Sequence, residues 1–298
     1  MVAGLSAVTL LSGFAPAQPV GWTDKGYPVW TEAQLALPPL PDAPEGATRI
    51  DAKLKGYVFG IKVIDADYDG WVGAETYALR SNLETAGLGA LVQKLRVWAV
   101  TEGRWDATGL YPVRHLQQNR DKKKRRVEME YGPDRVEVSV IPPNGSQGTP
   151  PASMAEKVSS DDTLSSLLNI MMRRTFMGAG MCAGTVPVFD SKQHYALRLV
   201  DRGADDRKLG DYAKVVGGPV RRCDIYYEPV SGFDAEDLPD ADEGATPVKM
   251  WLGEVPDPGG GGYDVPMRFS YKISGFKAVI KVDRIAFDFA DGSRVELD

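Results

Sequence analysis

Apolar and polar residues alternate along several short stretches of the chain. This period-two pattern gives an extended strand one apolar face and one wetter face, as in an antiparallel sheet. The alternating apolar residues are Tyr57, Phe59, Ile61 and Val63; Val136, Val138 and Val140; Leu197 and Leu199; Phe269, Tyr271 and Ile273; and Ile285, Phe287 and Phe289. Asp291 and Gly292 separate two such runs and favour a hairpin turn. The pattern predicts a mainly β protein with about a dozen strands.

One segment has helical periodicity instead. Leu164, Leu167, Leu168 and Met171 recur at a spacing that places them on one face of a helix. The residues before them, 159–162, are Ser-Ser-Asp-Asp, whose side chains accept hydrogen bonds from the free backbone N–H groups of a first turn. Arg173 and Arg174 suit the last turn, and Gly178 and Gly180 end the pattern. We therefore expect one substantial helix over about residues 163–174, covering one end or face of the sheet.

The first residues are typical of an export signal. Residues 2–16 carry no charge, and Ala15-Pro16-Ala17 supplies the small residues of a cleavage site. No Lys or Arg precedes the apolar run, and a buried N-terminal helix is the alternative, which Gly4, Gly13 and Pro16 disfavour. We interpret residues 1–17 as a signal peptide, which predicts a periplasmic protein.

The remaining chain divides into two parts by composition. Residues 18–49 are rich in proline, with Pro39, Pro41 and Pro44 close together, and we expect a flexible leader that does not pack. Residues 50–298 form a single β-rich domain in this interpretation. No further apolar run is long enough to span a bilayer, and a net charge of −6 gives no reason to expect nucleic acid as a partner.

Cys182 and Cys223 are the two cysteines of the chain. An even number of cysteines in an exported protein favours a disulfide between them. The alternative is a catalytic cysteine, because residues 180–184 read Gly-Met-Cys-Ala-Gly, as in a nucleophile elbow. An elbow needs a strand before it and a helix after it, whereas here the predicted helix comes first. We therefore predict the disulfide.

Other candidate chemistry is weak. Asp65, Asp67, Asp69 and Gly70 resemble half of a calcium-binding loop, but the twelfth position is a threonine and no helices flank the segment, so a strand and turn are favoured. The histidines, His115 and His194, fall in strand patterns without a local metal or triad signature, and we expect each to be exposed or half-buried. No catalytic residue, metal site or cofactor is predicted.

A basic run lies between two strand patterns, at the expected tip of a hairpin. A solvated turn accounts for it, because charged tips discourage aggregation. Clustered positive charge also suits anionic head groups or lipopolysaccharide phosphates, so an anionic-surface role is the alternative. The residues of this second hypothesis are Lys122, Lys123, Lys124, Arg125 and Arg126.

The order of several short motifs over residues 50–298 resembles one protein family. The motifs are Gly109-Leu110-Tyr111-Pro112, Pro142-Pro143, Val188-Phe189-Asp190, Cys223-Asp224-Ile225-Tyr226 leading to Gly232-Phe233, and Val265-Pro266-Met267-Arg268. They resemble DUF3108, a proteobacterial family of periplasmic envelope proteins described as a domain of unknown function. Residues 191–194 depart from the family, which tends to have Gly and basic residues there. The resemblance implies a strongly curved antiparallel sheet, or an open β-barrel or β-spiral, with one short helix.

Two classes of function fit these features. A curved sheet offers a concave apolar face, so a non-enzymatic envelope protein that binds an acyl or lipid ligand, or an envelope protein partner, is the main hypothesis. The alternative is a hydrolase of envelope polymers or esters, which lacks a recognisable pair of nucleophile and base in the sequence. The oligomeric state is left open by the sequence.

Overall fold

The computed structural model describes residues 14–87, 90, 94–121, 123–177, 182–205, 219–240, 244–273 and 276–297. Strands dominate these residues. The strands are β1 Gly21–Trp22, β2 Pro28–Val29, β3 Thr48–Val58, β4 Ile61–Val72, β5 Thr76–Thr85, β6 Arg96–Asp106, β7 Gly109–Asn119, β8 Arg126–Tyr131, β9 Val136–Ile141, β10 Thr185–Phe189, β11 His194–Asp205, β12 Val220–Ser231, β13 Val248–Pro256, β14 Gly262–Ile273, β15 Phe276–Asp288 and β16 Arg294–Leu297.

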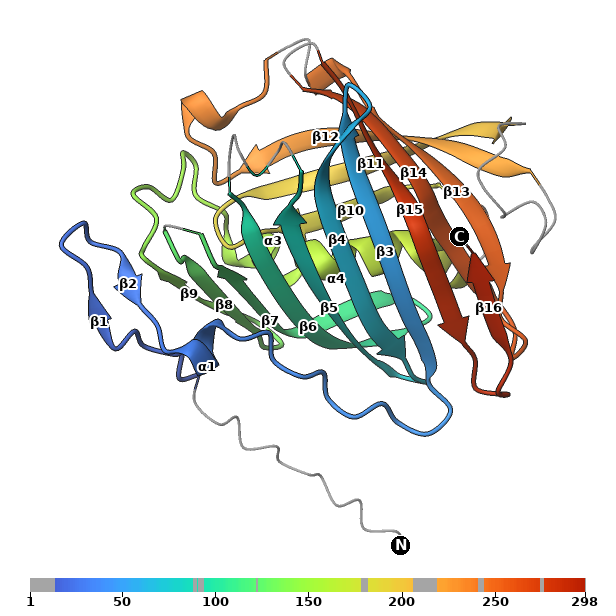
Figure 1. Cartoon of the computed structure of the whole chain (residues 1–298), viewed down its shortest axis with the longest axis horizontal. Helices are drawn as coiled ribbons and strands as arrows, with labels where there is room; N and C mark the ends of the chain where they lie inside the picture. Colours follow the sequence, from blue (N-terminus) through green and yellow to red (C-terminus); the bar gives the residue numbers. More distant parts are fainter. Residues whose placement is uncertain are drawn as a thin grey trace, which may run out of the picture.

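All strands except β1 and β2 belong to one antiparallel sheet. Its order is β10-β11-β12-β13-β14-β15-β3-β4-β5-β6-β7-β8-β9, so nearly every strand pairs with its neighbour in sequence. The exception is β15, which joins the two ends of the chain by pairing with β3 on one side and with both β14 and β16 on the other. The sheet curves strongly around a central helix, as Figure 1 shows. The predicted mainly β, curved antiparallel fold is confirmed.

The two edges of the sheet do not pair with each other. The segment that follows β9 lies between them instead: the backbone N–H of Thr149 donates to the carbonyl of Phe233, and Asp161 forms a parallel bridge with Val188 on β10. A cluster of buried apolar residues, which includes Met129 and Phe189, joins β8 and β10 at this seam. The two edges are therefore not joined by strand pairing, and the segment after β9 bridges them.

The helix predicted from the spacing of Leu164 to Met171 is present as α4, Thr163–Met171. Asp162 is its N-cap, and its side chain accepts hydrogen bonds from the backbone N–H groups of Leu164 and Ser165. Three shorter helices, α1 Glu32–Leu35, α3 Met154–Val158 and α5 Arg173–Met177, were not predicted as separate helices. Gly178 and Gly180, the expected stop, lie outside the described residues. The prediction of a single short helix is therefore incomplete, although α4 is the longest of the helices described.

Helix α4 lies inside the curve of the sheet. It contacts β5, β6 and β7 on one side and β10 and β14 on the other, and Figure 1 shows it between the two arms of the sheet. The largest buried cluster combines Leu168 and Met171 of α4 with inward residues of the sheet such as Ile50, Phe287 and Val265. The helix therefore supplies the core of the curved sheet.

The segment that precedes β3 does not behave as the flexible leader that its prolines suggested. It runs along the outer face of the sheet, where Trp30 is only 4% exposed and donates from Nε1 to the carbonyl of Lys124 at 2.8 Å. Trp98 and Trp71, which point outward from the sheet, donate to the carbonyls of Leu35 and Pro41. Outward tryptophans that need cover explain why this proline-rich stretch packs.

The first predicted strand is divided in two. Residues 59 and 60 form the turn between β3 and β4, so Phe59 lies at a hairpin tip and not within a strand. The apolar alternation looked continuous in the sequence because Tyr57 and Ile61 each lie two residues from Phe59. This correction also shows that Tyr57 faces outward, opposite to the inward residues of the same strand, Ala52 and Leu54.

Candidate functional site

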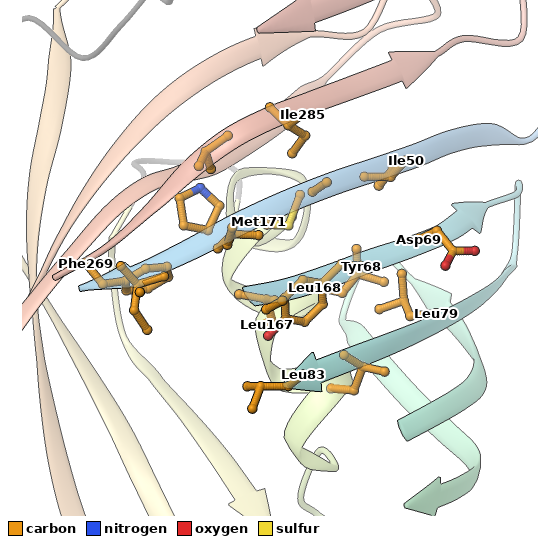
Figure 2. A pocket seen from close by; sticks show the side chains of 18 of the residues that line it. Ile50, Tyr68, Asp69, Leu79, Leu83, Leu167, Leu168, Met171, Phe269 and Ile285 are labelled. Carbon is orange, nitrogen blue, oxygen red and sulfur yellow. The ribbon is translucent and has the colours of Figure 1, made fainter. Parts of the chain in front are cut away.

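An apolar cavity of about 330 Å³ lies between α4 and the inner face of the sheet. Figure 2 shows side chains of α4, such as Leu168 and Met171, facing Tyr68, Leu79 and Phe269 of the strands across this space. The lining residues come from α4 and six strands and are Ile50, Ala52, Leu54, Gly56, Ile64, Ala66, Tyr68, Asp69, Leu79, Arg80, Leu83, Leu164, Leu167, Leu168, Met171, Val248, Pro266, Phe269, Tyr271, Ile280, Val282 and Ile285. The volume is within the range of about 300–1,000 Å³ that is common for small-molecule sites.

The cavity follows from the sizes of the inward residues. Ala52, Gly56 and Ala66 are small and adjacent on β3 and β4, so the sheet cannot fill the space beneath α4. The apolar side chains of α4 form the opposite wall because their helical spacing places them all on the side that faces these strands. Small residues opposite a helix leave the packing incomplete and create a slot.

The slot has an extended apolar lining. It extends along β3 from Ile50 to Gly56, which corresponds to about 20 Å of extended strand. Several of its side chains, including Leu54, Leu83 and Phe269, are only partly buried, so apolar surface in the slot is open to solvent. An apolar lining of this extent can accommodate a flexible linear chain.

The polar groups in the lining are few. The phenol of Tyr68 lies deep enough that burial raises its pKa, and the same cause raises the pKa of Tyr271. Asp69 and Arg80 pair with each other at 2.8 Å. The lining described here contains no histidine, cysteine, serine or threonine. The polar groups of this lining are therefore two phenols and one ion pair.

A buried polar cluster lies at the N-terminus of α4, next to the cavity but not part of its lining. Asp162 accepts hydrogen bonds from the hydroxyls of Thr101 and Ser165, and its Oδ1 lies 2.9 Å from Nδ1 of His115. Burial alone would raise the pKa of Asp162, but the attraction of His115 and the hydrogen bonds from Ser165 hold the pKa at about 2. This cluster anchors the helix to β6 and β7.

The pKa of the neighbouring Asp161 is shifted in the opposite direction, upward. Its carboxylate accepts a hydrogen bond from Nδ2 of Asn169 at 2.7 Å, and burial raises its pKa to about 7 against the effect of that bond. Asn169 also accepts a hydrogen bond from Arg173, which donates in turn to the carbonyls of Ala183 and Thr185. The second carboxylate therefore links α4 to β10.

The cluster does not have the order of a catalytic triad. In a triad the imidazole lies between serine and aspartate, so that it can take the serine proton. Here Asp162 lies between Ser165 and His115, and both partners are buried. His115 is 1% exposed, so the expectation of an exposed or half-buried histidine is wrong at this position. His194 is buried as well, with Nδ1 3.5 Å from Glu156.

Cys182 and Cys223 form the predicted disulfide, with their Cα atoms 5.7 Å apart. The bond joins the start of β10 to β12, and both cysteines belong to a buried apolar cluster with Val186 and Met250. The competing interpretation of a nucleophile elbow included Gly180 and Met181, which lie outside the described residues.

The basic run lies at the turn between β7 and β8, as predicted, but its residues differ in exposure. Arg126 is 8% exposed, pairs with Glu128 and packs against the ring of Trp30 at 5.5 Å, so it does not belong to an exposed basic surface. Arg125 donates to Asn144, and Lys124 is half-buried. Lys123 is exposed, and Lys122 lies outside the described residues.

The aspartates that resemble a calcium loop lie within the continuous strand β4. Asp65 pairs with Lys62 and Asp69 pairs with Arg80, so strand ion pairs account for two of the three carboxylates. Within the part of the chain that the structure describes, no three His, Cys, Asp or Glu side chains gather as a metal site. Among the same residues, no helix has the length and hydropathy needed to cross a membrane.

Sequence reasoning missed the cavity and the polar cluster for different reasons. The spacing of Leu164 and Leu167 predicted the helix, but the sequence does not say which strands the helix faces. The pairing of Asp162 with His115 and Thr101 depends on contacts across about 47 to 61 residues of chain, for which the sequence holds no local signal. The run of Ser and Asp before the helix did predict the cap.

The chain was compared with known proteins. The model of a family described as a protein of unknown function, DUF3108, matches residues 52–274. No curated protein matches the sequence. A solved structure from Brucella abortus, described as a beta-barrel-like protein of domain of unknown function DUF1849, is similar at 14% sequence identity and a TM-score of 0.42. That alignment covers 81% of this chain and 97% of the Brucella chain.

Proposed function

The chain belongs to the DUF3108 family, and we propose that it is a non-enzymatic envelope protein that binds one acyl chain in the slot beneath α4. The observation that supports this proposal is the apolar lining of a cavity of about 330 Å³ that extends along β3 from Ile50 to Gly56. Burying each methylene of a ligand contributes about 0.8 kcal/mol, so a linear chain gains affinity along the full length of the slot.

The proposal includes a periplasmic location. The uncharged N-terminal run that ends in Ala15-Pro16-Ala17 supports export, and a disulfide between buried cysteines suits an oxidising compartment. A hydrolase is the weaker alternative, because the described lining of the slot has no nucleophile beside a base. Ser165 of α4 is buried outside this lining and donates to Asp162.

The test is competition with a fluorescent fatty acid, cis-parinaric acid, by saturated fatty acids of increasing length. We expect the dissociation constant to fall about fourfold for each added methylene until the chain fills the slot, and then to stay constant. Replacing Leu54 or Leu83 with tryptophan fills the slot and should abolish binding.

The matched control is Leu238→Trp, which makes the same exchange at a leucine that is exposed and away from the slot. This variant should bind as the wild type does, and the melting temperatures of all variants report whether the fold is kept. Equal binding by Leu54→Trp, Leu238→Trp and the wild type would contradict the proposal, as would no binding by the folded wild type.

A further inference from the structure

The tip of the β3–β4 hairpin carries an aromatic residue in an unfavourable conformation. Phe59 has a φ of 53° and is followed by Gly60 with a φ of 78°, so both residues of the turn adopt the left-handed region. Asn or Asp is the usual first residue of such a turn, because a bulky side chain is strained there. The side chain of Phe59 is also 72% exposed. Neither burial nor backbone preference explains a phenylalanine at this position.

Directly behind this tip, the outer face of the sheet has a basic hollow. It has a volume of about 430 Å³ and is lined by Tyr57, Phe59, Gly60, Arg268, Lys277, Val279 and Lys281. Three of these residues are cationic and none is acidic. The ammonium group of Lys281 lies 5.0 Å from the centre of the Tyr57 ring, and this contact with the aromatic face holds one charge at the wall of the hollow.

The cations of this hollow oppose each other across strands. In the register of β14 and β15, Arg268 lies opposite Lys281, and Lys272 lies opposite Lys277. Like charges in directly opposed positions destabilise a sheet unless an anion lies between them. Within the described part of the chain, Lys272, Lys277 and Lys281 form no ion pair with a carboxylate, in contrast to Lys55 on the next strand, which pairs with Asp283 at 2.7 Å. These three lysines therefore carry positive charge that no carboxylate of the described residues neutralises in an ion pair.

The basic hollow and the apolar slot use opposite faces of the same strand ends. Tyr57 and Lys281 face the hollow. The residues that precede them in the chain, Gly56 and Ile280, line the slot. The end of the slot near Gly56 and the exposed Phe59 are therefore at one rim of the sheet. A surface that binds this rim would meet the slot and the cations together.

We propose that this rim docks on an anionic phospholipid bilayer, with Phe59 in the interfacial layer and the cations of the hollow on lipid phosphates. The positive charge of Lys277 and Lys281 is complementary to such a surface, and aromatic side chains favour the boundary between head groups and acyl chains. This docking rests on the proposed function, because its role would be to let acyl chains enter the slot from the bilayer at this rim.

The experiment is co-sedimentation of the full chain with vesicles of phosphatidylcholine alone and of phosphatidylcholine mixed with phosphatidylglycerol. We expect binding to the anionic vesicles only, weakening as salt is raised toward about 1 M, where the Debye length is about 3 Å. The variant Lys277→Glu/Lys281→Glu should lower the association constant by about 30-fold or more, since each basic residue near an anionic membrane contributes about fivefold. Phe59→Asn should weaken binding while raising the melting temperature, because Asn tolerates the turn conformation.

The control is Lys123→Glu/Lys124→Glu, which makes the same change of charge in the β7–β8 turn and should bind as the wild type does. Loss of binding in that variant instead of Lys277→Glu/Lys281→Glu would overturn the proposal, as would equal binding to neutral vesicles. Release of the protein by millimolar inorganic phosphate at constant ionic strength would also overturn it, because the hollow would then be a site for a small free anion.

The same variants separate this inference from the proposed function. Lys277→Glu/Lys281→Glu should bind cis-parinaric acid normally, and Leu54→Trp should bind anionic vesicles normally. Fatty-acid binding without vesicle binding contradicts the docking rim alone, and vesicle binding without fatty-acid binding contradicts the slot alone.

Discussion

At the scale of single residues, two adjacent carboxylates at the start of α4 respond to pH in opposite directions. The folded state holds the pKa of Asp162 at about 2, below its ordinary value, because His115 and Ser165 favour the charged form against the cost of burial. Its contribution to stability is therefore present above about pH 4 and is lost as the pH falls toward 2. Asp161 has a raised pKa of about 7, because burial favours its protonated form. Its contribution is present below about pH 4 and is lost as the pH rises toward 7.

This difference predicts the effect of Asp161→Asn. The amide keeps an oxygen that can accept the hydrogen bond from Asn169 and cannot ionise, so the variant should lose less free energy of unfolding between about pH 4 and pH 7 than the wild type does. We expect a difference on the order of 1–3 kcal/mol, measured by urea unfolding at a series of pH values. Asp67→Asn changes an exposed aspartate and serves as the control, which should follow the wild type. If the free energy of unfolding of the wild type and of both variants changed by the same amount over this pH range, the result would contradict a raised pKa for the buried Asp161.

At the scale of elements, the segment before β3 acts as part of the fold. Its residues Trp30, Gln34 and Leu35 contact outward residues of β6 and β8, and the ion pair between Arg126 and Glu128 lies beneath them. A buried ion pair is costly unless its remaining hydrogen bonds are satisfied. The carbonyl of Gln34 accepts one such bond from Arg126 at 3.1 Å. The segment therefore completes the environment of this pair.

Two tryptophans of this segment provide a matched comparison. Trp30→Ala removes a buried ring and leaves Arg126 and Glu128 partly uncovered, so we expect a loss of about 3–5 kcal/mol in the free energy of unfolding or release of the segment. Urea unfolding measures the first outcome, and faster cleavage by a protease before residue 48 measures the second. Trp22→Ala, at a position that is 55% exposed, should change neither. Identical behaviour of the two variants would mean that the segment does not stabilise the sheet.

The elements differ in how far the sequence could predict them. Strand and helix patterns arise from local periodicity, so α4 and most strands were predictable from the apolar positions alone. The packing of the segment before β3 was not, because its prolines indicate an extended chain but do not show that Trp71 and Trp98 point outward and need cover. The turn at Phe59 was missed because an apolar residue with positive φ contradicts the preference for glycine and asparagine on which turn prediction depends.

At the scale of the whole molecule, the curved sheet has an interior that its own helix fills only in part. The contacts of Asp161 and Asp162 fix the start of α4 to β10 and to β6 and β7, and the disulfide between Cys182 and Cys223 ties β10 to β12. The helix is thus held firmly at one end while its apolar side chains stand opposite Ala52 and Ala66 across an unfilled slot. Stable anchoring beside incomplete packing is the arrangement expected of a binding site and not of a core alone.

The slot could not be predicted from the sequence, because its walls come from segments far apart in the chain. Ile50, Leu167 and Phe269 meet there only because β15 pairs with β3 and closes the two arms of the sheet around α4. The family resemblance predicted a curved sheet. The match to the DUF3108 model over residues 52–274 confirms the resemblance itself. The prediction of an acyl ligand depended on the concave face, and the structure adds the residues with which to test it.

Native mass spectrometry of the protein purified from cells without detergent tests the central claim most directly. We expect the wild type to carry a single acyl-containing molecule, and Leu54→Trp, purified in the same way, to carry none because the added ring occupies the slot. Leu238→Trp should carry the same molecule as the wild type. A wild type that is free of lipid and stays free after incubation with fatty acids, or a Leu54→Trp variant that carries the same molecule at the same occupancy, would contradict the account.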